Sequence, residues 1–292
     1  MKYSVFTLTT PDYDTDEILD KLQQFGYDGV EWRVTELSSL SSPPSSREEW
    51  FHKYNKCTVD IQRLDELADS LRANCERKGL EIVSLGSYLT TKEFDAVSRV
   101  MSVAERIGCG KVRVKLPSYS GKMPYRKLFD DSCRELDALI PVAERTGVQI
   151  VVEVHHRTIM PSCSAAYRLV SHFDPKHVGV IHDAGNMVIE GNEGMAMGLD
   201  VLGPYLAHVH LKNAHWKLQS SLEDGTERWG TEMSPLRAGI VDQRELAKLL
   251  VERGYDGYVS FEDFSTVHST EVSLRDNIAY MKAIFASLAS DN

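Results

Sequence analysis

Charged side chains gather where apolar segments of this sequence end. The stretch VVEVHHRTIM, residues 151–160, begins as a buried strand would and then places Glu153, His155, His156 and Arg157 close together. Because side chains alternate between the two faces of a strand, Glu153 and His155 share one face. A carboxylate and an imidazole on one face can bind a metal ion or move a proton.

Three further apolar segments end in the same way. Asp183 closes VGVIHD, His210 lies in LAHVHLKN, and Glu262 lies near the end of GYVSFED. If these segments are neighbouring strands, three carboxylates crowd together and repel unless a positive charge lies between them. Three oxygen donors and one imidazole favour Mn²⁺ or Mg²⁺, and they also suit Zn²⁺ or Co²⁺. We therefore predict one divalent metal ion held by Glu153, Asp183, His210 and Glu262.

Other polar residues near strand ends are candidates for binding a substrate. They are His155, Asn186, Lys212, Glu31, Lys115 and Trp216. Lys212 could bind a substrate carboxylate or phosphate, or it could pair with Glu31. His155 could donate to a substrate hydroxyl or orient Glu153. Trp216 could line the sugar site, although packing of its segment against the rest of the protein is the simpler interpretation.

The elements that must position these residues alternate along the chain. Short apolar segments predict strands at 3–8, 29–34, 81–88, 111–116, 149–155, 178–183, 206–213 and 257–263. Longer amphipathic segments predict helices at 15–25, 61–78, 92–107, 125–146, 163–172, 194–203, 242–253 and 271–288. The first helix has clear end signals, because Asp14 and Glu17 match a capping box and Gly26 suits its C-terminal end.

Eight strands, each followed by a helix, close most naturally into a (β/α)8 TIM barrel, here a single domain over 1–292. A doubly wound open sheet is the alternative, but it usually carries a glycine-rich loop after its first strand, where this chain reads TTPDYD. The charged residues fall at the C-terminal ends of strands, where barrel enzymes keep their chemistry. Two segments interrupt the alternation: a Ser/Pro-rich loop at 38–49 and a long loop at 214–238, which is either a lid or a surface excursion.

Composition narrows the classes of partner. The net charge of −10 over 292 residues disfavours nucleic acid and, more weakly, anionic membranes. No apolar run approaches the ~18 residues of a membrane span, and the first residues lack a signal-peptide pattern. Five cysteines without a CxxC pair indicate reduced thiols. We expect a cytoplasmic protein that binds a small molecule, and association into a homo-oligomer is left open.

The strand-end motifs VEVHH, HDAGN, HVHLKN and YVSFED resemble the xylose-isomerase-like barrels, in particular the sugar phosphate isomerase/epimerase branch. That branch includes ketose 3-epimerases, hydroxypyruvate isomerases, inosose dehydratases and endonuclease IV. The segments GYDGVEW and PLRAGIVDQREL extend the resemblance over nearly the whole chain. It implies the barrel, the four metal ligands named above, and acid/base roles for Glu153 and Glu262 on opposite faces of a bound ketose.

The chain departs from the epimerase pattern at two positions. Asn186 stands where the epimerases place a histidine, and Trp216 stands where they place a sugar-contacting arginine. These departures argue against the usual epimerase substrate and leave the metal site intact. Endonuclease IV needs additional histidines for three zinc ions, and here the third strand ends SLGSY, so DNA cleavage is disfavoured. A non-catalytic binding protein is disfavoured by the intact set of four ligands.

The function predicted from these residues is that of a metal-dependent sugar isomerase or epimerase acting on a keto-sugar or related polyol. Glu153 or Glu262 would take a proton from the carbon next to a carbonyl that the metal polarises. Return of the proton to the same carbon gives epimerisation, and return to the neighbouring carbon gives isomerisation. Loss of a β-hydroxyl gives dehydration, so an inosose or dehydroshikimate-type dehydratase is the alternative that the ligands alone do not separate.

Overall fold

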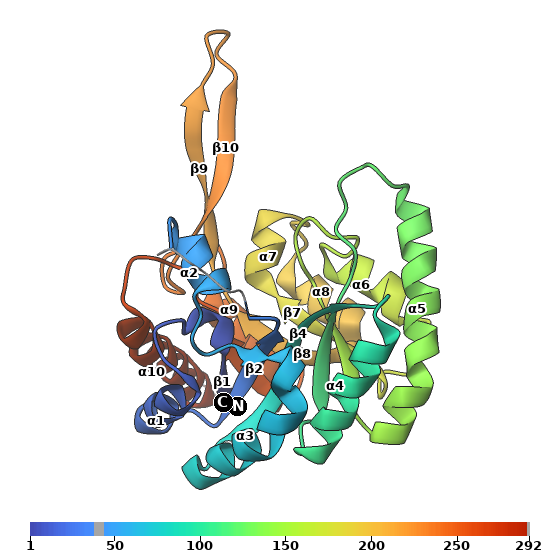
Figure 1. Ribbon diagram of the computed structural model, residues 1–292. Coiled ribbons are helices and arrows are strands. Elements are labelled where there is room, and N and C mark those ends of the chain that lie inside the picture. Colours follow the sequence, from blue (N-terminus) through green and yellow to red (C-terminus); the bar gives the residue numbers. More distant parts are fainter. Residues whose placement is uncertain (38–43, 291–292) are drawn as a thin grey trace.

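Eight parallel strands close on themselves in the computed structural model, which describes residues 1–37 and 44–290 (Figure 1). They are β1 (Lys2–Phe6), β2 (Gly29–Thr35), β4 (Glu81–Thr90), β5 (Lys111–Lys115), β6 (Gln149–Glu153), β7 (Val178–Asp183), β8 (Leu206–Leu211) and β11 (Tyr258–Phe261). Each pairs with the next in this order, and β11 pairs back with β1. A short strand, β3 (Val59–Asp60), pairs with β2 on the outside of this closed set. The predicted (β/α)8 TIM barrel is confirmed.

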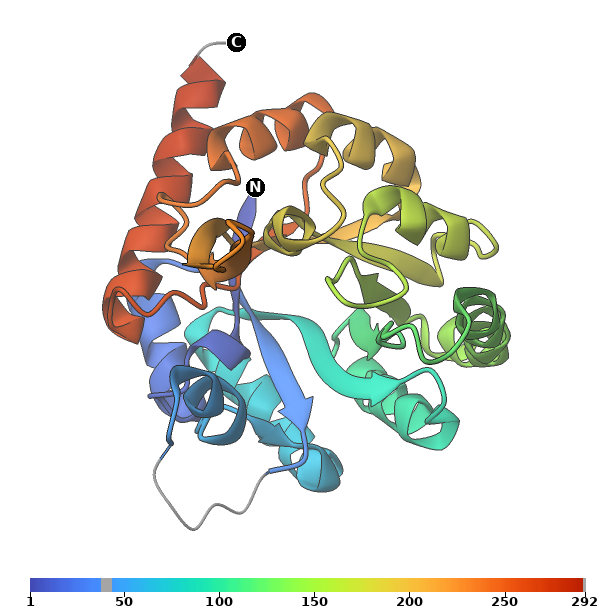
Figure 2. The ribbon, with the colours of Figure 1, turned by 90° about the horizontal axis from the view of Figure 1, so that it is seen from above.

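A helix follows each barrel strand, and the helices ring the barrel when it is seen from above (Figure 2). They are α1 (Thr15–Phe25), α3 (Leu64–Lys78), α4 (Phe94–Arg106), α5 (Tyr125–Thr146), α6 (Cys163–Val170), α8 (Met195–Leu202), α9 (Gln243–Glu252) and α10 (Thr270–Ser290). Those labelled α1 and α5 have the predicted bounds, and the others differ by at most three residues at either end. The capping box at α1 is confirmed, because Asp14 and Glu17 accept each other's backbone N–H.

The apolar core lies between the strands and the helices. Val30, Trp32 and Val34 alternate along β2 and belong to the large apolar cluster, whereas Glu31 and Arg33 take the opposite face. The side chains of Trp32 and Glu31 are both fully buried, Trp32 in the apolar cluster and Glu31 on the opposite face of β2. The inside of the barrel is therefore unusually polar, and it is this polar interior that leads up to the strand ends.

Two predicted loops differ in the structure. The segment 214–238 contains a two-stranded antiparallel hairpin, β9 (Ala214–Ser221) and β10 (Glu227–Met233), which projects from the barrel (Figure 1). Asp224 and Gly225 form its turn, with Gly225 at a φ of 83° that favours glycine, and this turn signal was not used in the prediction. In the Ser/Pro-rich segment, residues 38–43 lie outside the described residues, and a helix, α2 (Arg47–Lys53), begins within the rest.

Within the described ranges, no helix is both long enough and apolar enough to span a membrane. All five cysteines are free thiols, and four of them are buried. Free thiols agree with the prediction of reduced cysteines.

Candidate active site

Side chains from four neighbouring strands converge at the C-terminal end of the barrel. Glu153 ends β6, Asp183 ends β7, His210 lies near the end of β8, and Glu262 directly follows β11. Each offers a ligand atom, and these atoms all lie within 4.8 Å of one another. The register explains the convergence, because Asp183 lies beside His210 across the β7–β8 pair. The structure thus brings the four predicted ligands together.

The two nitrogens of His210 face different neighbours. Nε2 lies 3.1 Å from Oε2 of Glu31, and a carboxylate can only accept, so Nε2 carries the hydrogen. Nδ1 is buried and has no hydrogen-bond partner among the described residues. It lies 3.5 Å from Glu153 Oε1, 3.7 Å from Glu262 Oε2 and 4.0 Å from Asp183 Oδ2. A lone pair and three carboxylate oxygens that face one another at these distances fit a shared cation.

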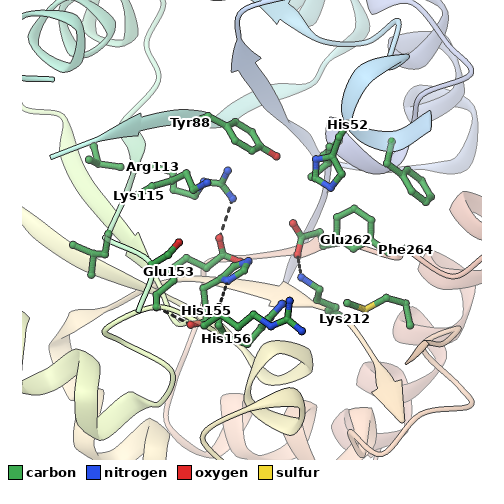
Figure 3. A pocket seen from close by; sticks show the side chains of 18 of the residues that line it. His52, Tyr88, Arg113, Lys115, Glu153, His155, His156, Lys212, Glu262 and Phe264 are labelled. Atoms are coloured by element: carbon green, nitrogen blue, oxygen red, sulfur yellow. Dashed lines mark hydrogen bonds and ion pairs between the residues drawn. The ribbon is translucent and has the colours of Figure 1, made fainter. Parts of the chain in front are cut away.

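Two buried cations partly balance the three carboxylates (Figure 3). Arg113 donates to Glu153 Oε2 over 2.9 Å, and Lys212 donates to Glu262 Oε2 over 2.6 Å. The same ammonium lies 3.3 Å from Asp183 Oδ2. All five side chains are nearly inaccessible to solvent, so these ion pairs act in a low dielectric and are strong. The site therefore retains a net negative charge that a divalent ion would reverse.

The shifts in pKa follow from this arrangement. Burial opposes ionisation of Glu153, but the charge of Arg113 and the nearby ring of His210 hold its pKa well below the usual value. Burial raises the pKa of Asp183 to about 7, with Lys212 opposing the shift and the neighbouring glutamates adding to it. Burial also opposes the charge on Lys212, yet Asp183 and Glu262 hold its pKa above the usual value. Glu153 is consequently ionised at neutral pH, as a base must be.

Asn186 holds two of the carboxylates in place. Its amide nitrogen donates to Glu153 Oε1 over 3.1 Å and to Asp183 Oδ2 over 2.9 Å. Asp183 in turn caps a short helix, α7 (Ala184–Ile189), by accepting the backbone N–H of Asn186 with Oδ1. Asn186 is fully buried and does not line the cavity, so its geometry supports orientation of the carboxylates rather than the predicted contact with substrate.

Glu31 lies behind His210. Its Oε2 is shared by Nε2 of His208 and Nε2 of His210, each at 3.1 Å, and the carboxylate is fully buried. Burial works against the charge on Glu31, but the two histidines hold its pKa well below the usual value. The suggested pairing of Lys212 with Glu31 is wrong, because Lys212 pairs with Glu262 and Asp183. Glu31 orients His210 and does not reach the cavity that the substrate would enter.

A cavity of about 810 Å³ opens above the converging side chains. Of the predicted substrate contacts, His155, Lys115 and Lys212 line it, whereas Glu31, Asn186 and Trp216 do not. Trp216 lies on β9 and donates to the backbone oxygen of Val188 in α7 over 2.9 Å, which agrees with the packing interpretation. The base of the hairpin still contributes Glu232 and Met233 to the cavity wall.

Several lining residues were not predicted to contact a substrate: Tyr88, Arg113, His156, Arg157 and Phe264. Arg113 shares a strand face with Lys115, so the two-residue period of β5 could have identified it. Nδ1 of His156 is hydrogen-bonded to the side-chain oxygen Oδ1 of Asn186 over 2.9 Å, and the His156 ring stacks on His155. Phe264 lies under the Lys212 ammonium, 4.9 Å from Nζ to the ring centre. Loop residues such as Arg157 and Phe264 carry no periodic signal.

Phe6 supports the histidine from below. Its ring stacks on that of His210 with centroids 5.9 Å apart, and Arg113 lies over the same ring. Gly86 makes this position possible, because a Cβ there would lie 2.4 Å from Cε2 of Phe6. A side chain at position 86 would push Phe6 into the space of the histidine.

Comparisons with known proteins agree with this geometry. The family model described as xylose isomerase-like TIM barrel matches residues 19–284. An inosose dehydratase of Halalkalibacterium halodurans is 22% identical over 234 residues, which cover 71% of this chain and 77% of that protein.

Solved structures share the whole barrel. A 3-keto-D-glucoside 4-epimerase from E. coli superposes with a TM-score of 0.70 at 18% identity and covers 97% of this chain and 99% of its own. A xylose isomerase-like TIM barrel protein from Mycobacterium smegmatis, in complex with magnesium, superposes with a TM-score of 0.66 at 18% identity, covering 98% and 97%. At such identities the likeness establishes the fold alone.

Proposed function

This chain belongs to the xylose isomerase-like TIM barrel family, and we propose that it is a metal-dependent isomerase or epimerase of a keto-sugar or related polyol. The proposed reaction is proton transfer at the carbon next to a carbonyl, with Glu153 and Glu262 as the acid and base. Glu153, Asp183, His210 and Glu262 would hold one divalent ion. When bound, that ion supplies Lewis-acid polarisation of the carbonyl.

One observation carries the proposal: the unpartnered Nδ1 of His210 faces three carboxylates at 3.5–4.0 Å. Two of these carboxylates, Glu153 and Glu262, also line the cavity that opens to solvent. A purely structural hydrogen-bond network would not leave a buried imidazole nitrogen without a partner. Here the donor set suits Mn²⁺ or Mg²⁺, and the likeness to a magnesium-bound barrel supports the assignment of the site.

The surroundings of Glu153 suit a general base. Arg113 binds Oε2 and Asn186 binds Oε1, so the carboxylate is held in one orientation and stays ionised. Arg113 also keeps a positive charge beside the enolate-like charge that develops on a substrate when its C–H bond breaks. A positioned base of this kind typically contributes about 10²–10⁴-fold to the rate.

Glu262 approaches from the opposite side of the cavity (Figure 3). Its Oε2 accepts from Lys212, which is itself held between Asp183 and the ring of Phe264. Lys212 therefore fixes Glu262 and can donate to a substrate oxygen as the proton moves. Two glutamates on opposite sides of one carbon allow a proton to leave from one face and return to the other, which is epimerisation. Return to the neighbouring carbon is isomerisation.

Dehydration is the second candidate, and the inosose dehydratase relative favours it. The same removal of a proton next to a carbonyl starts both reactions. In dehydration the departing β-hydroxyl must be protonated, and Lys212 together with Glu262 could supply that proton. The departure of Asn186 from the epimerase pattern is compatible with this reaction, because Asn186 binds carboxylates here and leaves the substrate to other residues.

Exchange of substrate hydrogen with heavy water tests the proposal. Ketoses, inososes and dehydroshikimate-like acids would be incubated with the protein and Mn²⁺ in deuterium oxide and examined by NMR and mass spectrometry. We expect deuterium next to the carbonyl of at least one substrate, and a product lighter by one water would identify a dehydratase. Protein that binds Mn²⁺ but exchanges no hydrogen in any of the three classes would contradict the proposal.

A further inference from the structure

The cavity contains two cations that no carboxylate neutralises. Four lining residues are basic, namely Arg113, Lys115, Arg157 and Lys212, and three are acidic, namely Glu153, Glu232 and Glu262. Arg113 pairs with Glu153, Lys212 pairs with Glu262, and Glu232 pairs with Lys217 outside the cavity. In the part of the chain that the structure describes, no carboxylate oxygen lies within 4 Å of the charged nitrogens of Lys115 or Arg157. Both side chains line the cavity and are exposed to solvent, in a chain whose net charge is −10.

The loops that follow β5 and β6, next to these two cations, are hydrogen-bonded to each other. Lys115 ends β5, and Arg157 lies in the loop that follows β6, the neighbouring strand. The loops are joined by an antiparallel bridge between Ser118 and Thr158, and the backbone N–H of Tyr119 donates to the oxygen of Arg157 over 2.8 Å. The cations are thus carried by one hydrogen-bonded unit, which forms one side of the cavity.

Arg157 is held in a backbone conformation that arginine rarely adopts. Its φ is 59°, in the left-handed region, which costs roughly 1 kcal/mol for a residue with a side chain. The conformation is fixed on both sides, since Tyr119 donates to its oxygen and Glu190 accepts its backbone N–H. Glu190 is occupied by the backbone and forms no ion pair with the guanidinium, so the side chain remains available to the cavity, which it lines.

One of the two cations, Lys115, lies across the cavity from Glu262. Figure 3 shows Lys115 on the side of Glu153 and away from Glu262. The Lys115 ammonium lies over the ring of Tyr88, 5.2 Å from its centre, which limits where it can point. A substrate whose reacting carbon lies between the glutamates can extend past Glu153 toward Lys115, and the loop that carries Arg157 is bridged to the loop that follows Lys115.

We propose that Lys115 and Arg157 form an anion subsite and that the substrate is an acidic hydroxy-ketone, carrying a carboxylate or a phosphate at the end remote from the reacting carbon. Ser118 adds a hydroxyl to this subsite. The inference rests on the proposed function, because it takes the other end of the ligand to be the hydroxy-ketone. Bidentate donation from Arg157 and a point charge from Lys115 suit either anion.

Binding of three matched ketoses tests the subsite. D-fructose, D-fructuronate and D-fructose 6-phosphate share the hydroxy-ketone and differ only at the last carbon, so calorimetry on the purified protein isolates the anion. At low salt we expect one of the two anions to bind about tenfold more tightly than D-fructose, with the preference falling as salt is added. The tighter of the two identifies a carboxylate or a phosphate as the partner.

Two single-residue variants test whether Lys115 and Arg157 cause the tighter binding of the anionic ketose. Lys115→Gln and Arg157→Asn should each weaken binding of the preferred anion about fivefold and leave D-fructose binding unchanged within twofold. Asparagine is chosen at 157 because it tolerates a positive φ, so the loop is preserved. Lys248→Gln, which removes an exposed cation from α9, is the matched control and should change none of the three affinities. Circular dichroism confirms that each variant is folded.

The proposal is overturned if neither anion binds more tightly than D-fructose, or if the variants weaken all three ketoses equally. Hydrogen exchange measured in parallel separates this result from the fate of the proposed function. If an anion binds through Lys115 and Arg157 but the protein exchanges no substrate hydrogen, the anion subsite is supported and the proposed enzyme reaction is contradicted. If hydrogen exchange occurs with neutral ketoses only, the proposed enzyme reaction is supported and the anion subsite is contradicted.

Discussion

The two sides of His210 present two clusters with similar residues and different chemistry. Behind the ring, Glu31 accepts from His208 and His210 with one oxygen, so each contact contains a hydrogen. In front of it, Nδ1 forms no hydrogen bond and faces three carboxylate oxygens at 3.5–4.0 Å. Both clusters bring ligand-type atoms within 4.8 Å of one another. The comparison teaches that proximity alone does not define a metal site: the rear cluster is already hydrogen-bonded, whereas the front cluster has three carboxylates against two cationic side chains and leaves Nδ1 of His210 without a hydrogen bond.

The largest expected effect comes from breaking the front cluster. Glu262→Gln should lower turnover about 10³-fold or more, because the variant loses both a base and a metal ligand. The fold should survive, since Lys212 keeps Asp183 as a partner. Steady-state kinetics and thermal melting measure the two effects. Glu252→Gln, on the exposed face of α9, is the control, and turnover of Glu262→Gln equal to that control would remove Glu262 from the mechanism.

Metal binding should stabilise the fold through the front cluster. Mn²⁺ at about 100 times its dissociation constant should add about 2.7 kcal/mol to the free energy of unfolding, which raises the melting temperature by several degrees. In Asp183→Asn the rise should be much smaller, because the variant loses a charged ligand. Differential scanning calorimetry with and without a chelator measures the difference. An equal rise in both proteins would show that the ion binds elsewhere.

Substitutions in the rear cluster, Glu31 and His208, should have smaller effects than those in the front cluster, and they should act on metal affinity. Glu31→Gln should weaken metal affinity about 10–100-fold by loosening the orientation of His210, and excess metal should restore turnover. His208→Gln should have a smaller effect, because His208 reaches the site only through Glu31. Metal titration of both variants makes the comparison. Turnover of Glu31→Gln that no metal concentration restores would place Glu31 in direct contact with the reaction.

The smallest effect is expected on the hairpin. Trp216→Phe removes the hydrogen bond to Val188 from a side chain that is 43% exposed, so stability should fall by at most about 1 kcal/mol. Turnover should stay within twofold, because Trp216 does not line the cavity. A tenfold loss of turnover at unchanged stability would favour the lid interpretation of this segment.

Sequence periodicity was sufficient for the barrel and for the convergence of four residues. Apolar strands ending in Glu153, Asp183, His210 and Glu262 gave both the face and the end of each strand, and closure of the barrel then brings these ends together. The two-residue period shows on which face of a strand a side chain lies, but it does not show how far the side chain lies below the end of the barrel. Glu31 is predicted to bind a substrate near a strand end, yet β2 continues four residues beyond it to Thr35, so Glu31 lies one layer below the cavity.

Local context that periodicity does not record explains the other differences. Asn186 lies in α7, a helix of six residues that is too short to predict from its pattern. Trp216 lies in a hairpin whose turn signal, Asp224–Gly225, is only two residues long. The period of β5 puts Arg113 on the same face as Lys115, but the pairing of Arg113 with Glu153 depends on the adjacent strand and therefore on the closed fold.

Crystals soaked in Mn²⁺ and measured for anomalous scattering test the central claim most directly. The account predicts one strong peak per chain, bounded by Glu153, Asp183, Nδ1 of His210 and Glu262, with Lys212 displaced or retained beside it. A peak between Glu31 and His208, three peaks in the barrel mouth, or no peak at all at saturating Mn²⁺ would contradict it.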